Sequence, residues 1–312
     1  MRRLTVPATV SVMVLGLVLG GGPAQATFPG SNGRIAFVSG WPQRDIYSAA
    51  PDGTDVMRLT TFAPKRSAYA PSWSADGTRI VFLKGRNGPS DAHQLWVMDA
   101  DGSNQHRVLS DPWFYDRAPT FSPDGSKILF ARCQYDPGQD RCAVVTVNVD
   151  GSRMDRLTTP GPEELVFSEM YSPDGTQIAF SVIFGRGVNF GIFVMDADGS
   201  NVELVTPPKI RAFGPDWAPD GSRLVFTRFC CGSKADSIWA VNPDGTGLVR
   251  ITAPGSRHDF QPVNSPDGTQ IVFERDNPDF TRWGLYTMNP DGTGITRIIP
   301  HEPYGAAWQP VA

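Results

Sequence analysis

Hydrophobic and polar positions along the chain repeat in a short block that recurs five times. Each block starts with an aromatic residue, or with Asn264 in the last copy, and runs through an Asp-Gly pair and two polar residues to an apolar run ending in Phe. The blocks occupy residues 73–82, 121–130, 171–180, 217–226 and 264–273. Their glycines recur at intervals of 46 to 50 residues, a period that predicts the blades of a β-propeller.

A second short strand ending in Asp-Gly occurs once per repeat, followed by a strand of the Arg-Leu-Thr type. These elements occupy residues 46–53, 95–102, 144–151, 192–199, 238–245 and 285–292. The Asp side chain can bond the nearby backbone and Gly accepts a positive φ, so each Asp-Gly predicts a tight hairpin between two β-strands. Each repeat therefore holds four strands, named A to D in chain order.

The two ends of the chain fix the number of blades. Residues 33–60 hold strands B, C and D without a preceding A strand, whereas residues 304–309 hold an A strand with Trp308 at the repeat's Trp position. One blade is then completed by both ends, which closes the ring and removes open sheet edges. We expect an all-β fold, a six-bladed β-propeller of four-stranded antiparallel blades.

The first 26 residues have the features of an export signal. Two arginines near the start precede an apolar stretch over residues 10–22 and an Ala-Gln-Ala sequence ending at Ala26. We expect residues 1–26 to be a signal peptide and residues 27–312 to be the propeller, without a membrane span and starting near Thr27. This predicts a secreted, periplasmic or cell-envelope protein; the alternative is an uncleaved membrane anchor.

Charge and cysteines narrow the choice of partner and environment. The net charge is −4, so the chain has no basic excess and a nucleic-acid partner is disfavoured. Cys133 and Cys142 flank one expected hairpin loop and can close it with a disulfide. Cys230 and Cys231 are adjacent, so they form a strained vicinal disulfide or stay reduced. Neither pair has the C-x-x-C spacing of a zinc site.

The repeated block resembles the hallmark of the TolB-type, WD-like β-propeller repeat family, Trp-Ser-Pro-Asp-Gly-x-x-Ile-x-Phe. The resemblance covers nearly the whole chain after the leader. It implies a propeller that is usually exported and often serves as a protein-binding platform, here without the separate N-terminal domain of TolB itself. The same repeat precedes the hydrolase domain of prolyl-oligopeptidase-like enzymes, and this sequence has no such domain.

The expected strand order places the A–B and C–D turns at one end of the ring and the longer, varied B–C and D–A loops at the other. We call this second end the B–C/D–A face, and we expect binding there because varied loops on a rigid scaffold carry function. Its most unusual segment is Trp113-Phe-Tyr-Asp-Arg117, rich in residue types enriched at binding hot spots. The candidate binding residues are Trp113, Tyr115, Asp116, Arg117, Phe213, His258, Asp259 and Tyr304.

A ring of side chains is expected at the channel mouth on the same face. It consists of the residues four positions before each Trp position: Tyr69, Arg117, Phe167, Phe213, Phe260 and Tyr304. These side chains either line a pocket or pack between the blades.

Motifs of catalysis are sparse. The sequence lacks a Gly-x-Ser-x-Gly nucleophile elbow, a His-Glu-x-x-His zinc motif and a phosphate-binding loop, and it indicates no cofactor and no firm metal site. His258-Asp259 and His301-Glu302 are expected in neighbouring loops, where they either bind a divalent metal ion or are simply solvated. The acidic turns at residues 99–104 and 196–201 lack the closing Glu of a calcium loop.

These observations favour an exported binding module, acting as a monomer on a protein, peptide or glycan through the B–C/D–A face. The alternative is a propeller enzyme, a hydrolase or lyase with a metal or acid–base site at the channel mouth. Propellers host both functions, so the fold alone does not choose between them.

Overall fold

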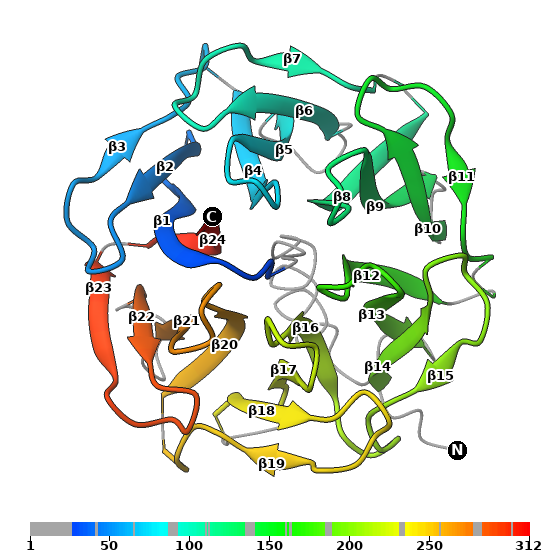
Figure 1. Cartoon of the computed structure of the whole chain (residues 1–312), viewed down its shortest axis with the longest axis vertical. Coiled ribbons are helices and arrows are strands. Elements are labelled where there is room, and N and C mark those ends of the chain that lie inside the picture. Colours follow the sequence, from blue (N-terminus) through cyan, green and yellow to red (C-terminus); the bar gives the residue numbers. More distant parts are fainter. Residues whose placement is uncertain are drawn as a thin grey trace, which may run out of the picture.

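Six four-stranded sheets stand around a central axis and form a closed ring (Figure 1). The computed structural model describes residues 27–312 except residues 41–42, 65, 87–92, 110, 112, 135–140, 160, 162–163, 185–188, 231–234, 256, 277–282 and 301. The described residues contain strands and turns but no helix, and so no helix able to span a membrane. The predicted six-bladed propeller is confirmed.

Blade 1 combines both ends of the chain, and blades 2 to 6 follow in chain order from the inner to the outer strand. Blade 1 consists of β24 (Tyr304–Val311), β1 (Ser31–Ser39), β2 (Asp45–Ala49) and β3 (Met57–Arg58). Blade 2 consists of β4 (Arg66–Trp73), β5 (Arg79–Arg86), β6 (Gln94–Asp99) and β7 (His106–Arg107). Blade 3 consists of β8 (Phe114–Phe121), β9 (Lys127–Gln134), β10 (Arg141–Asn148) and β11 (Asp155–Arg156).

The remaining blades have the same order of strands. Blade 4 consists of β12 (Leu165–Tyr171), β13 (Gln177–Phe184), β14 (Asn189–Asp196) and β15 (Glu203–Leu204). Blade 5 consists of β16 (Ala212–Trp217), β17 (Leu224–Arg228), β18 (Ser237–Val241) and β19 (Val249–Arg250). Blade 6 consists of β20 (His258–Asn264), β21 (Ile271–Asp276), β22 (Gly284–Met288) and β23 (Thr296–Pro300).

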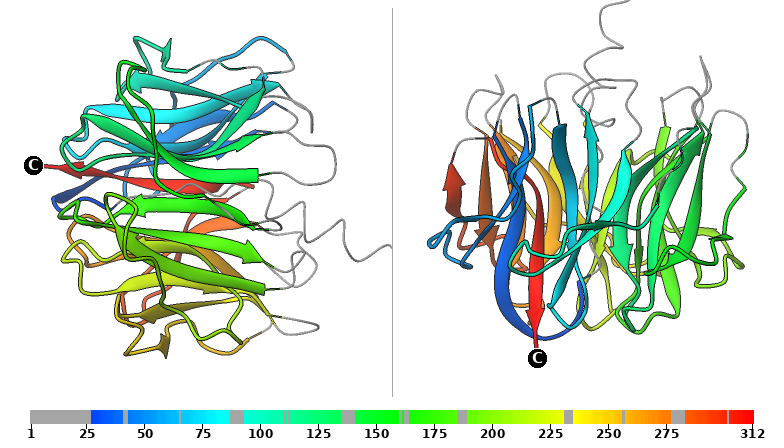
Figure 2. Two further views of the ribbon diagram at one scale, coloured as in Figure 1. Left: turned by 90° about the vertical axis from the view of Figure 1, so that its right-hand side faces the viewer. Right: turned by 90° about the horizontal axis from the view of Figure 1, so that it is seen from above.

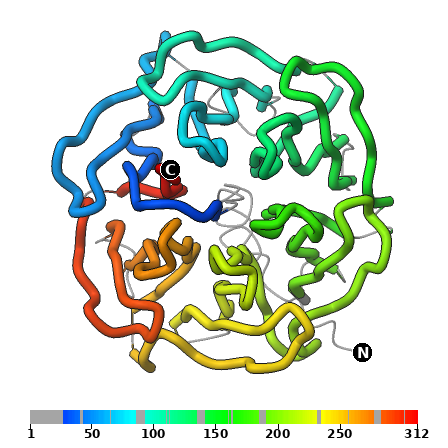
Figure 3. Tube along the Cα trace, in the orientation of Figure 1, coloured from blue at the N-terminus to red at the C-terminus, as the bar shows by residue number. Residues whose placement is uncertain are grey.

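The C-terminal strand closes the ring, as the sequence predicts. β24 pairs antiparallel with β1, and Trp308 lies opposite Ile35 in this pairing. The first and last strands of the described chain therefore lie side by side in blade 1 (Figure 3). Seen from the side, the strands run from one end of the ring to the other, and the C-terminus leaves at the end where the A strands finish (Figure 2).

The repeated Asp-Gly pairs form the tight turns that their chemistry predicts. In the first A–B turn the Asp76 carboxylate accepts hydrogen bonds from the backbone N–H of Thr78 at 3.0 Å and from its hydroxyl at 2.8 Å. Gly77 has a φ of 66° and its N–H donates to the Ser74 carbonyl at 2.9 Å. A residue with a Cβ is strained at this φ, which explains why Gly recurs at the position.

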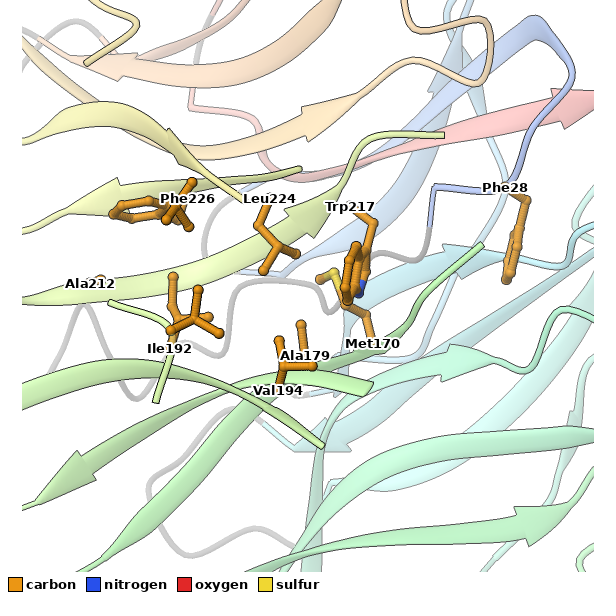
Figure 4. Packing of buried hydrophobic residues seen from close by; sticks show 11 residues of the cluster. Phe28, Met170, Ala179, Ile192, Val194, Ala212, Trp217, Leu224 and Phe226 are labelled. Atoms are coloured by element: carbon orange, nitrogen blue, oxygen red, sulfur yellow. The ribbon is translucent and has the colours of Figure 1, made fainter. Parts of the chain in front are cut away.

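Apolar side chains fill the spaces between neighbouring blades. Between blades 4 and 5, Met170 and Ile192 pack with Trp217 and Phe226 in one buried cluster (Figure 4). Trp217 is 1% exposed. Complete burial of a large apolar side chain stabilises the fold by about 2–3 kcal/mol. The Trp position of the repeat is therefore a packing position between blades.

Each inner strand contains a β-bulge near its start. The register shifts within every inner strand pairing, for example between Tyr69 and Ser72 of β4. One residue of each bulge has a positive φ of 45° to 65°; these residues are Ala70, Ala118, Ser168, Gly214, Gln261 and Gly305. Each comes directly after a member of the expected channel-mouth ring, so the bulge determines how those side chains are aimed.

Candidate functional site

The D–A segment of blade 3 presents an aromatic and cationic group at the B–C/D–A face. The Trp113 side chain is 77% exposed, just before β8 begins. The Asp111 carboxylate holds this turn, since it accepts a hydrogen bond from the Trp113 backbone N–H at 3.0 Å. Further along the segment, the Arg117 guanidinium stacks on the Tyr115 ring at 4.9 Å and donates to its hydroxyl at 3.3 Å. Tyr115 and Arg117 thus form a half-buried stacked pair that follows the exposed Trp113 in the chain.

Asp116, on the same strand β8, is buried. Its nearest cation is Arg132 of β9, whose Nη1 atom lies 3.7 Å from the carboxylate. Burial raises the pKa of Asp116 to about 7, although the Arg132 charge opposes this shift. Arg132 also bonds Asp111 at 3.1 Å and lies over the Phe114 ring. Among the sequence candidates of this segment, Asp116 is therefore a buried side chain beside Arg132 and not an exposed contact residue.

His258 and Asp259 are adjacent on β20, but the structure gives them different partners. The Nδ1 atom of His258 lies 3.0 Å from the Asp236 carboxylate of blade 5, whose pKa is raised by burial. Asp259 accepts two hydrogen bonds from Arg275, at 2.5 and 2.9 Å. His301, the other half of the suggested metal pair, lies outside the described residues. Within the described part of the chain, no three His, Cys, Asp or Glu side chains gather as metal ligands.

Most members of the expected ring pack against neighbours. Tyr69 and Tyr304 hold the Arg44 guanidinium between their rings, at 5.5 and 5.2 Å. Phe213 packs against Phe229 of the same blade, with ring centroids 6.3 Å apart. The remaining aromatic members, Phe167 and Phe260, are buried. These contacts hold the ring side chains against their blades. Phe213 belongs to blade 5 and Tyr304 to blade 1, whereas Trp113 precedes the inner strand of blade 3.

The cysteines differ between the two pairs. Cys133 and Cys142 lie opposite each other in β9 and β10 and form a disulfide across this hairpin of blade 3. Cys230 is a half-buried free thiol within the described residues, and its backbone N–H donates to the Asp236 carboxylate at 2.9 Å. Cys231 lies outside the described residues, so a vicinal bridge stays a prediction.

Sequence reasoning missed several buried acids, among them Glu274 on β21 and Asp216 on the inner strand β16. Glu274 is 1% exposed and accepts a hydrogen bond from the Gly305 N–H of the neighbouring blade at 2.8 Å. Asp216 is also 1% exposed and accepts from the Asn264 backbone N–H at 2.7 Å. A signal for Asn264 was present, because it replaces the aromatic residue found at this position in the other blocks.

Comparisons with known proteins agree with this architecture. A family model described as TolB beta propeller domain matches residues 139–310. The uncharacterized protein Atu1656 of Agrobacterium fabrum is 35% identical over 178 residues, which cover 52% of this chain and 55% of that protein. The Tol-Pal system protein TolB of Anaeromyxobacter dehalogenans strain 2CP-C is 31% identical over 141 residues, 45% of this chain and 29% of that protein. The matches thus span about half or less of these relatives.

Solved structures share the fold at low sequence identity. TolB from Acinetobacter baumannii superimposes with a TM-score of 0.72 at 22% identity, covering 98% of this chain and 74% of that one. An oligogalacturonate lyase from Vibrio parahaemolyticus has a TM-score of 0.63 at 14% identity, covering 90% and 78%. At such identities the likeness extends to the fold alone, since propellers carry unrelated functions.

Proposed function

Because the chain belongs to the TolB beta-propeller family, we propose that it is a binding module that captures a partner through its B–C/D–A face. The partner is a protein, peptide or glycan outside the cytoplasmic membrane, and the expected leader directs the chain there. Matched relatives are named as components of the Tol-Pal system, which favours a protein of the cell envelope as the partner class.

The observation that carries this proposal is the exposure of Trp113. A Trp side chain that is 77% exposed keeps a large apolar surface in water, and interfaces are enriched in Trp, Tyr and Arg. Its neighbours Tyr115 and Arg117 are already held by their mutual stacking, so little rotamer entropy is lost when a partner covers them. A partner that covers Trp113 removes this surface from water and gains the aromatic contact.

Capture by immobilised protein tests the proposal. The mature chain is incubated with the envelope and extracellular fractions of the producing organism, and the bound proteins are identified. We expect Trp113→Ala and Tyr115→Ala to lower partner capture at least tenfold, since a hot-spot residue contributes about 2 kcal/mol or more. Both variants should keep the thermal stability of the original chain, because Trp113 is exposed and Tyr115 lies at the surface end of β8.

The matched control is Val56→Ala, which trims an apolar side chain that is 53% exposed before the outer strand β3. It should capture the partner as the original chain does. If both blade 3 variants keep every partner of the original chain, the binding surface lies elsewhere.

A further inference from the structure

The described chain starts inside the ring. From the start of β1, the segment of residues 27–30 runs toward the centre of the propeller (Figure 1). Phe28 is 3% exposed and belongs to the apolar cluster of Met170 and Trp217. The Gly30 N–H donates to the Pro266 carbonyl of blade 6 at 3.2 Å. The segment is therefore packed against blades 4, 5 and 6, although it leads into β1 of blade 1.

Thr27 ends this segment at a buried carboxylate. Its hydroxyl Oγ1 lies 3.0 and 3.1 Å from the two carboxylate oxygens of Asp216, and 3.1 Å from the Asn264 carbonyl. Asn264 also donates to Asp216 through its side-chain Nδ2 at 2.8 Å. Thr27 is 4% exposed, so this contact is shielded from water. Three elements meet here: the N-terminal segment, the inner strand of blade 5 and the inner strand of blade 6.

Asp216 has hydrogen-bond donors but no cation among the described residues. All the donors that reach it belong to Thr27 and Asn264, which are neutral. Burial raises the pKa of Asp216 to about 8, and no neighbouring positive charge opposes this shift. A buried carboxylate without a cation is costly for a fold, unless it stays protonated or receives a positive partner.

We propose that Asp216 is the docking site for the α-ammonium group of the mature chain. The proposal rests on leader cleavage between Ala26 and Thr27, and it is independent of the partner-binding proposal. Hydrolysis of this peptide bond adds water: Ala26 leaves with a carboxylate, and the Thr27 nitrogen becomes an amine that takes a proton. The nitrogen and Oγ1 of Thr27 are separated by only three bonds, so cleavage creates the ammonium within a few ångströms of the hydroxyl that contacts Asp216.

Leader removal then completes an ion pair inside the ring. Before cleavage the Thr27 nitrogen belongs to a neutral amide, and afterwards it carries a positive charge next to Asp216. The pair joins the N-terminal segment, which leads into blade 1, to blades 5 and 6. Maturation thereby stabilises the folded propeller, because an opposite charge in a water-poor site favours the ionised carboxylate.

Thermal unfolding of chains with different N-termini tests the docking. Residues 27–312 contain all 24 described strands, and removal of an N-terminal fusion partner leaves Thr27 as the first residue. A second chain carries Gly-Ser before Thr27, which moves the ammonium away from Asp216. At pH 7 we expect the chain starting at Thr27 to unfold about 3 °C or more above the extended chain. Asp216→Asn should remove this difference, because it has no carboxylate to pair.

The second measurement is the melting temperature of the unsubstituted chain after acetylation of its Thr27 α-amine. Acetylation should lower this temperature to that of the extended chain, because it removes the positive charge without changing any side chain. Equal melting temperatures of the free, extended and acetylated chains would contradict the docking. A difference between the free and extended chains that persists in the Asp216→Asn variant would contradict it as well. Sequencing the N-terminus of the exported protein tests the cleavage site separately. A start other than Thr27 overturns the docking in the exported protein, even if the ion pair forms in the engineered chain.

Discussion

Two groups of acidic side chains in this propeller differ in environment and charge. In the turns, hydrogen bonds from Ser122 and Ser126 hold the pKa of Asp124 below its usual value, so this group stays ionised. Glu274 on β21 of blade 6 is buried, and burial raises its pKa to about 8. The hydrogen bonds from the Gly305 N–H and the Trp283 side chain, which lower the pKa, do not offset the loss of water. Glu274 is therefore neutral at pH 7, whereas the turn aspartates are charged.

This difference predicts a pH-dependent stability. The unfolded chain releases the Glu274 proton near pH 4.5, while the folded chain keeps it until about pH 8. Below pH 4.5, the pKa of the unfolded chain, the stability that Glu274 contributes is present in full. It falls by about 1.4 kcal/mol for each pH unit between that value and the folded pKa of about 8, and above the folded pKa it is lost. Glu274→Gln has no proton to lose, so it should gain stability over the original chain as pH rises from 4.5 to 8. Thermal unfolding across this range measures the gain, and a pH-independent difference would contradict the assignment.

Among the structural elements, the bulged inner strands recur in all six blades. Each bulge forces one residue into the left-handed region, which costs about 1–2 kcal/mol for a residue with a Cβ. Only two of the six positions hold glycine, Gly214 and Gly305, so the sequence carries no consistent glycine signal for this feature. The bulge also sets the direction of the ring side chains, which is why their packing could not be predicted from spacing.

Gly214→Ala isolates the backbone cost of the bulge. Gly214 has a φ of 61°, and a Cβ placed there meets no atom within 4 Å. The variant should lose about 1 kcal/mol of unfolding free energy through backbone strain alone. Gly255→Ala is the control, since its Cβ also meets nothing within 4 Å and its φ is not positive. Urea denaturation of both variants measures the effect, and equal stability of the two would show that the bulge carries no strain.

For the whole molecule, the architecture could be predicted from the sequence, because the same local chemistry is repeated in every blade. The Asp-Gly turns, the Trp position and the lone A strand at Trp308 together specify six blades and their closure. The site could be predicted only in part. Trp113 is exposed, as expected of a binding residue. The pairing of Asp259 with Arg275 depends on strand register, and that of His258 with Asp236 depends on contacts between blades. Such pairings have no signature in the local sequence.

Because the last strand closes the ring, we expect truncation of its Trp308 side chain to lower the unfolding free energy strongly. Trp308 is 4% exposed and packs in the cluster between blades 6 and 1. Trp308→Ala should cost about 3–5 kcal/mol of unfolding free energy, the usual result of truncating a buried aromatic residue. Trp113→Ala, at an exposed position, should change it by less than about 0.5 kcal/mol. Urea denaturation compares the two; a Trp308 variant as stable as the Trp113 variant would mean that β24 does not hold the ring closed.

Site-specific photo-crosslinking tests the central claim, that a partner is bound at the B–C/D–A face, most directly. A photoreactive phenylalanine derivative replaces Trp113 on this face or the exposed Asp150 in the C–D turn at the opposite end of blade 3. After irradiation in the envelope and extracellular fractions, position 113 should form a covalent adduct with the captured partner and position 150 should not. Adducts at position 150 without any at position 113 would place the binding surface at the opposite end of the ring and contradict the account.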